Sequence, residues 1–219
     1  MNLLDIYFSP AKFFSNLKEK PKWLIPLIII VVVSIILTIV VLTSFGPEQR
    51  LAQLRERNIP PEQIERAEKM MQGPIPLISG IIAAVIFTPA MLLVIALIFN
   101  FILPLLGTTG IFLTTFSCIV GAALVRIPAM FVKIILILIK GTPIVHTSFA
   151  LFVPMIAKNT FLFRFLSKLD FFTIWEVILI GLGLQTIYAI KGKKNYYLVF
   201  GIWLLYIIVT SLFPGRAAQ

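Results

Sequence analysis

Long apolar runs separated by short polar segments set the pattern of this chain. A helix that crosses the hydrocarbon core of a membrane needs about 20 consecutive apolar residues. Five runs reach or approach this length, at about residues 24–45, 75–106, 111–131, 171–190 and 196–213. They predict an all-α polytopic membrane bundle with five transmembrane helices. The pattern holds no series of alternating apolar and polar positions, which would be typical of a membrane β-barrel.

The first 23 residues have the pattern of a short amphipathic helix. Ser9-Pro10 suits the N-cap and first turn of a helix, and Phe13, Phe14 and Leu17 then share one face. We expect residues 1–23 to form an interfacial helix that lies on the cytoplasmic leaflet. A solvated basic tail is the alternative.

Residues 46–73 are the one clearly polar segment, with five Lys or Arg and five Glu residues. Glu62–Arg66 and Glu65–Lys69 have the i,i+4 order that stabilises a helix. We predict a small extramembrane helical hairpin divided at Pro60-Pro61. A solvated charged face is the simpler interpretation of this segment, and a surface for partner docking is the alternative.

Residues 141–169 contain an apolar stretch of about 15 residues, which is short for a crossing. Lys158, Arg164 and Lys168 then follow among Phe and Leu residues. We expect interfacial helices here rather than a sixth span. Residues 214–219 form a tail.

The net charge is +10, from 19 Lys and Arg against 9 Asp and Glu residues. Most of these cations lie beside apolar runs, where they set the topology and contact anionic headgroups. Basic and aromatic residues do not interleave in a polar segment, so we expect no nucleic-acid partner. The expected partners are the lipid bilayer and its anionic headgroups. Small residues at 80 and 84 and at 117, 121 and 122 form faces for internal packing, other membrane proteins or self-association.

The position of the lysines favours a cytoplasmic N-terminus, although a raw count does not. Seven Lys or Arg residues would then lie inside and roughly ten outside, which opposes the positive-inside rule. However, the four N-terminal lysines and the three at 191–194 lie directly at span ends. We therefore predict a multi-pass protein with its N-terminus in the cytoplasm.

Residue counts exclude most catalytic chemistry. His146 is the single histidine, so a zinc H-E-x-x-H motif cannot form. Asp5 and Asp170 are the only aspartates and neither is central in a span, which excludes an intramembrane aspartyl pair. A serine–histidine pair with His146 has no further support, and Cys118 is expected to be a buried, inert thiol. We expect no enzyme, cofactor or metal.

The third run carries charge inside an apolar segment, which is costly and therefore marks a candidate site. Arg126, Lys133 and Lys140 are seven residues apart and form one stripe on a helix. Pro128 follows the first of them and Pro89 interrupts the second run, so both predict helix kinks. The stripe could line a polar path for anions or headgroups.

Arg126 also has a candidate partner. It lies roughly 22 Å along a helix from residue 111, and Glu176 lies one to two turns into the next span from the same side of the membrane. We predict an ion pair between Arg126 and Glu176, with Asp170 as a second acceptor. As alternatives, Thr173 and Glu176 form a capping box, Asp170 caps the helix, and Arg126 snorkels to the interface.

Several motifs together resemble the Yip-domain family, named for interaction with Ypt/Rab GTPases, in its prokaryotic branch. They are residues 169–175 (LDFFTIW), 181–184 (GLGL) and 191–194 (KGKK), with 8–14 (FSPAKFF), Leu17 and Pro21 near the start and 114–128 in the third run. The resemblance implies five spans, a cytoplasmic N-terminus and no catalytic residues. Arg126 departs from the family pattern, which has a more apolar position before the proline.

The resemblance limits the expected partners and function. Eukaryotic relatives carry a long cytosolic N-terminal region and act in ER–Golgi traffic with Rab partners. Only 23 residues precede the first span here, so we do not expect Rab-type GTPase binding. We expect a non-enzymatic protein of the prokaryotic plasma membrane that scaffolds or organises membrane or partner proteins. The alternative is a small transporter, channel or lipid-translocating protein that uses the charged stripe.

Overall fold

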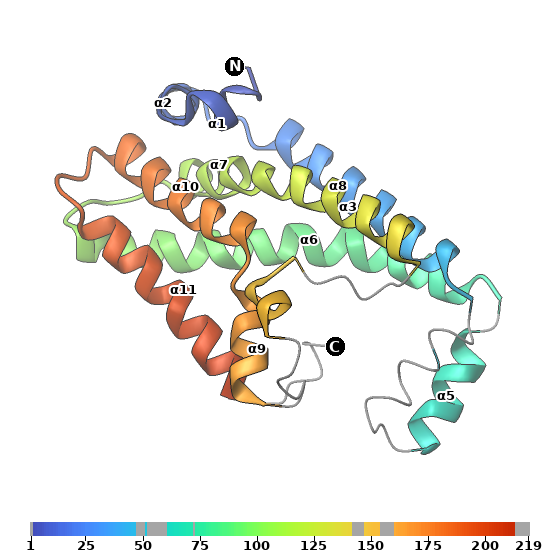
Figure 1. The fold of residues 1–219 in the computed structure, drawn as a ribbon. Helices are drawn as coiled ribbons and strands as arrows, with labels where there is room; N and C mark the ends of the chain where they lie inside the picture. The colour runs from blue at the N-terminus through green and yellow to red at the C-terminus, as the bar shows by residue number, and fades with distance from the viewer. Residues whose placement is uncertain are drawn as a thin grey trace.

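The computed structural model describes residues 2–46, 51, 61–71, 73–141, 147–153 and 160–212. These residues form helices, with one isolated bridge between Ser148 and Asp170 (Figure 1). In chain order the elements are α1 (Asp5–Phe8), α2 (Pro10–Glu19), α3 (Leu24–Ser44), α5 (Pro61–Met71), α6 (Ile75–Ile102), η1 (Leu103–Leu106), α7 (Phe112–Ala122), η2 (Ala123–Val125), α8 (Arg126–Lys140), η3 (Phe149–Phe152), α9 (Phe161–Lys168), α10 (Phe171–Tyr188) and α11 (Lys194–Leu212).

Five helical segments in the described part of the chain are long and apolar enough to cross a membrane. They are Leu24–Ser44, Ile75–Leu106, Phe112–Lys140, Phe171–Tyr188 and Lys194–Leu212. This confirms the predicted all-α bundle with five membrane-spanning helices. The third segment continues past residue 131, the end estimated from the sequence, and reaches Lys140.

The third segment continues through Pro128 as a helix. A short 3-10 turn interrupts the α-helical geometry just before this proline. The 3-10 turn η2 separates α7 from α8, and Pro128 occupies the third position of α8. The N–H groups in the first turn of a helix have no acceptor within that helix. A proline at such a position therefore removes no hydrogen bond of the helix. Pro89, in contrast, lies inside α6, which continues through it as one helix.

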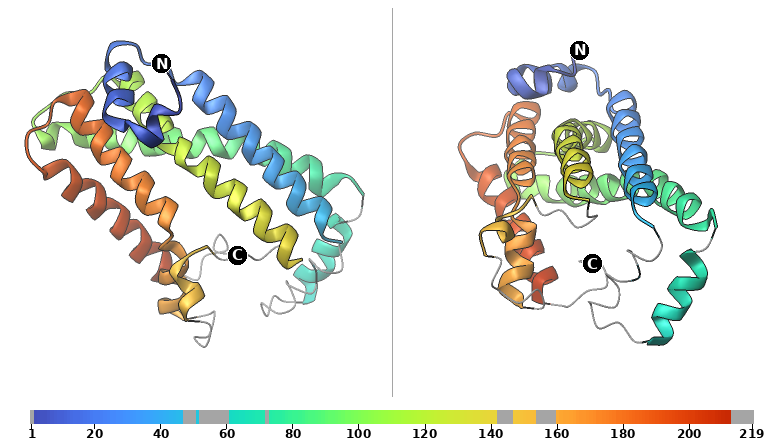
Figure 2. Two further views of the ribbon diagram at one scale, coloured as in Figure 1. Left: turned by 45° about the horizontal axis from the view of Figure 1, so that its top comes forward. Right: turned by 45° about the vertical axis from the view of Figure 1, so that its right-hand side comes forward.

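The helix α7 lies at the centre of the bundle. Every residue from Thr114 to Val125 is buried. The helices α2, α3, α6 and α10 contact α7, and the right-hand view of Figure 2 shows α3 and α10 on either side of it. The pairing of α3 with α6 is close because Gly80 has no side chain. A Cβ atom at Gly80 would lie 2.9 Å from Cγ2 of Thr38.

The elements α1 and α2 form a strap, residues 5–19, that crosses one flank of the bundle over α7 and α10 (Figure 2). Ile6, Phe13, Phe14 and Leu17 of this strap are fully buried. The amphipathic helix is therefore present as predicted, and Phe13, Phe14 and Leu17 form its apolar face. That face packs on protein rather than on the acyl chains of a leaflet.

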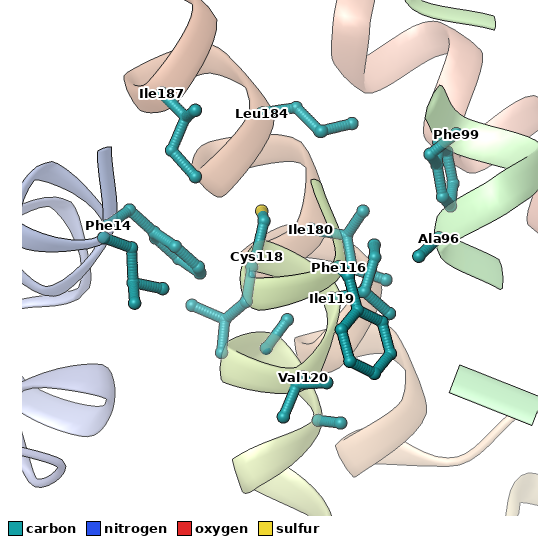
Figure 3. Packing of buried hydrophobic residues seen from close by; sticks show 14 of the residues in the cluster. Phe14, Ala96, Phe99, Phe116, Cys118, Ile119, Val120, Ile180, Leu184 and Ile187 are labelled. Carbon is teal, nitrogen blue, oxygen red and sulfur yellow. The ribbon is translucent and has the colours of Figure 1, made fainter. Parts of the chain in front are cut away.

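Two glycines of the bundle explain why the strap packs so closely. A Cβ atom at Gly121 would lie 2.7 Å from Cε1 of Phe13, and one at Gly183 would lie 2.8 Å from Cε1 of Phe14. Figure 3 shows Phe14 of the strap beside Cys118 of α7. Cys118 is fully buried, and the Cβ position at Gly183 also falls against its sulfur.

The segments between the spans are described in part. The second arm of the predicted hairpin is α5, where Lys69 Nζ donates to Glu65 Oε1 at 2.8 Å. In the predicted interfacial segment, residues 141–169, the short elements η3 and α9 are helical. Residues 47–50 and 52–60 of the hairpin, His146, Lys158 and the tail at 214–219 lie outside the described residues.

Candidate functional site

The structure brings Arg126 and Glu176 together across two spans. Arg126 Nε donates to Glu176 Oε2 at 2.8 Å, and Arg126 Nη2 donates to Glu176 Oε1 at 2.7 Å. The two parallel bonds use the planar fork of the guanidinium, which is the strongest arrangement for this pair. The Glu176 side chain is 9% exposed and that of Arg126 is 30% exposed. The pair therefore fixes α8 to α10 inside the bundle.

The local helix geometry places both side chains at this point. Arg126 begins α8 directly after the 3-10 turn η2, which also contacts α10. Glu176 is the sixth residue of α10, one to two turns from its start. The helices α8 and α10 are in contact at this point, and the two side chains meet there.

Asp170 has a different role from the predicted second acceptor. Its Oδ1 accepts from Phe172 N at 2.8 Å and from Thr173 N at 3.1 Å, and its Oδ2 accepts from Thr147 Oγ1 at 2.7 Å. Asp170 therefore caps α10, one of the alternatives that the sequence left open. Its carboxylate lies closer to the unpaired N–H groups of the first turn than to Arg126. With Asp170 as the cap, the Glu176 carboxylate serves Arg126 rather than a capping box.

A comparison with family models decides where this architecture belongs. A model described as the Yip1 domain matches residues 4–213, which include the strap and all five spans. The chain belongs to the Yip1 domain family. No curated protein and no solved structure matches the chain.

The three cations of the charged stripe in this Yip1 domain have different surroundings. Lys133 and Lys140 are exposed on α8, whereas Arg126 is partly buried on Glu176. Within the described residues, neither lysine has an ion-pair partner. Two hollows are lined by residues outside the stripe, one of 390 Å³ at the α6–α7 turn and one of 200 Å³ between the end of α3 and the start of α6.

A second polar cluster joins α6, α7 and α10 of the Yip1 domain, and the sequence reasoning missed it. Thr115 Oγ1 donates to Asn100 Oδ1 at 3.0 Å and shares a hydrogen bond of 2.7 Å with the Tyr188 hydroxyl. Asn100 was visible in the sequence as a polar residue in a charge-free run. Its partners are not local in sequence, so no spacing rule indicates them.

Two further hydrogen bonds tie backbone carbonyls to distant side chains. Pro128 has no N–H for the carbonyl of Leu124, four residues before it. The Tyr7 hydroxyl donates to this carbonyl at 2.7 Å and so attaches the strap to η2. In α11, the buried Asn195 Nδ2 donates to the Gly181 carbonyl of α10 at 2.7 Å. The first bond links the strap to η2, and the second links α11 to α10.

The described part of the Yip1 domain holds no cluster of three or more His, Cys, Asp or Glu residues that could bind a metal ion. The polar contacts between its helices are made by hydroxyl, amide and paired ionic groups, namely the Thr115 cluster, Asn195 and the Arg126–Glu176 pair. This arrangement can fix the relative positions of helices and of the strap.

Proposed function

We propose that this Yip1 domain protein is a non-enzymatic integral membrane protein that scaffolds or organises membrane or partner proteins. The ion pair between Arg126 and Glu176 carries the proposal. An arginine that serves an anion path needs an uncompensated positive charge, whereas the charge of Arg126 is paired with Glu176 through Nε and Nη2. The charge therefore supports the bundle, and the apolar outer faces are left for lipid and for other membrane proteins.

We also propose a location and an orientation. The motifs at residues 8–14 and 169–175 support a protein of the prokaryotic branch, in the plasma membrane of the cell. The strap joins α3 at the end of the bundle where the loop with Lys191, Lys193 and Lys194 lies. Lysines on both segments favour this end as the cytoplasmic one and attract anionic headgroups. Rab-type GTPase binding is not part of the proposal.

A flux experiment separates this proposal from transport. The purified protein and its Arg126→Ala and Lys133→Ala variants are reconstituted into liposomes, and the movement of chloride, inorganic phosphate and a fluorescent phospholipid is measured. We expect the wild type and both variants to match protein-free liposomes. Flux in the wild type that Arg126→Ala abolishes and Lys133→Ala preserves would overturn the scaffold in favour of a polar path.

A crosslinking experiment tests the scaffold directly. A photoreactive residue is placed at exposed Tyr197, at exposed Phe101 or, as a control, at buried Leu184. In native membranes we expect discrete protein adducts from at least one exposed position and none from Leu184. If both exposed positions react with lipid alone, the proposed organising role fails.

A further inference from the structure

The short helix α9 presents two cations on one face at the end of the bundle away from the α10–α11 loop. Arg164 and Lys168 are four residues apart, so they are neighbours on the helix surface. The helix packs against α11 and η3, and Figure 1 shows it beside the end of α11. Lys168 Nζ donates to Thr210 Oγ1 of α11, which fixes the lysine beside the arginine.

These two cations have no counter-ion in the described structure. The ion pairs there join Lys12 to Asp5, Lys69 to Glu65 and Arg126 to Glu176. The Nε atom of Arg164 is buried and has no hydrogen-bond partner among the residues that the structure describes. Burial, and then the charge of Arg164, lower the pKa of Lys168. Neighbouring like charges and an unpaired buried donor are each unfavourable, and a bound anion relieves both.

The surroundings indicate where that anion comes from. Aromatic side chains next to the cations are exposed on η3, α9 and the start of α10, namely Phe149, Phe152, Phe161 and Phe171. Exposed aromatic residues at the ends of spans are typical of the depth at which headgroups lie. The exposed Leu162 of α9 adds apolar surface for an acyl chain. A soluble anion would gain nothing from this apolar rim.

We propose that Arg164 and Lys168 bind the phosphate of one anionic phospholipid, whose acyl chains pack on the exposed side chains of Phe161 and Leu162. Lysine has three donors, and the bond to Thr210 uses one, so two remain for phosphate oxygens. An anionic lipid is preferred over a zwitterionic one because neither cation has an ion-pair partner among the described residues, and two unpaired cations repel a choline group. The site is separate from the lysines at the other end of the bundle.

Lipid binding to the purified full-length protein tests this site. Adducts with phosphatidylglycerol are counted by native mass spectrometry, and thermal unfolding is followed with phosphatidylglycerol, phosphatidylcholine or inorganic phosphate. The variant Arg164→Gln/Lys168→Gln removes two charges, and the control Lys133→Gln/Lys140→Gln removes two exposed charges of α8. We expect phosphatidylglycerol to bind the wild type and the control equally and the α9 variant about tenfold or more weakly.

Two results would overturn the proposal. One is equal binding of phosphatidylglycerol by the α9 variant and the control. The other is the same stabilisation by inorganic phosphate as by phosphatidylglycerol, which would assign a soluble anion to the site. If the α9 variant does not fold, a photoreactive phosphatidylglycerol is crosslinked to the wild type. Adducts must then map to peptides of α9 or the end of α11, and adducts that map only elsewhere refute the site.

Discussion

Arg126 of α8 and Glu176 of α10 are 50 residues apart in sequence and share two hydrogen bonds of 2.8 and 2.7 Å. Loss of one partner leaves the other charge buried without compensation, which costs about 3–5 kcal/mol. We therefore expect Arg126→Glu and Glu176→Arg each to lower the unfolding temperature strongly. The double reversal restores the pair and should unfold at a higher temperature than either single variant, as measured by tryptophan fluorescence in one detergent.

Lys133→Glu is the matched control for this series because Lys133 is exposed on the same helix. It should change the unfolding temperature little. A double reversal that is no more stable than the weaker single variant would show that the contact does not hold the two helices together.

Gly183 should tolerate no side chain, because Cys118 Sγ and Phe14 of the strap occupy the space. A Cβ atom there would lie 2.8 Å from Cε1 of Phe14. We expect Gly183→Ala to destabilise the protein by about 1–3 kcal/mol, the usual cost of overpacking. Gly201→Ala is the control, since nothing lies within 4 Å of its Cβ position, and alanine should stabilise α11 there by up to about 1 kcal/mol. Equal effects of the two substitutions in thermal unfolding would contradict this packing.

Tyr7→Phe should loosen the strap. It removes the hydrogen bond to the Leu124 carbonyl, at a cost of about 1 kcal/mol. Burial raises the pKa of the Tyr7 phenol above its ordinary value of about 10. The folded protein thus keeps a proton that the unfolded chain releases. This contribution to stability is complete below pH 10 and is lost as the pH rises through the folded pKa.

The measurement for Tyr7 is the free energy of unfolding at pH 7 and across alkaline pH. The wild type should lose stability above pH 10 more steeply than Tyr7→Phe does. Tyr197→Phe, at an exposed tyrosine of α11, should follow the wild type. If the free energy of unfolding depended on pH in the same way for all three proteins, Tyr7 would make no contribution to the alkaline loss of stability.

Thr115 and Tyr188 should be energetically coupled. Their hydroxyls share a hydrogen bond of 2.7 Å between α7 and α10. Hydrogen bonds between membrane helices contribute about 0.6 kcal/mol on average and up to about 1.7 kcal/mol. In a double-mutant cycle of Thr115→Val and Tyr188→Phe, we expect a coupling energy in this range. Thr186→Val, whose hydroxyl bonds to the Leu182 carbonyl within α10, replaces Thr115→Val in the control cycle and should show no coupling with Tyr188.

Asp170→Ala should weaken the start of α10. Asp170 accepts from two N–H groups of the first turn and from Thr147, and the loss of such a cap costs about 1 kcal/mol. Thr173→Ala is the control for the alternative capping box and should have a smaller effect on chemical unfolding. The reverse order would assign the cap to Thr173.

The spans and the ion pair could be predicted from the length and charge of each apolar run and from distances along a helix. A long apolar run with few charges has only one favourable environment, so the five spans can be read from the sequence. The partner of Arg126 could be proposed because few acidic residues lie near a span. Simple depth arithmetic then brings Glu176 to the same level.

The position of the strap required information that no local pattern holds. Phe13, Phe14 and Leu17 have the same spacing whether they enter lipid or cover a bundle. The missing side chains at Gly121 and Gly183 decide between the two, because they leave room for Phe13 and Phe14. These glycines belong to different helices and are 62 residues apart in sequence (183 − 121). Thr115 and Tyr188 pose the same problem, since any mid-span hydroxyl has many potential partners before the helices are placed.

Cys118 gives this architecture a practical consequence. It is the only cysteine of the chain and is fully buried, with Phe14 of the strap beside it (Figure 3). A maleimide can reach the thiol only in molecules whose strap has lifted from the bundle. When closing is faster than labelling, the reaction rate reports the fraction of lifted molecules and hence the free energy of opening. The labelling rate of Cys118 thus measures how firmly the strap is docked, and it can be measured in intact membranes.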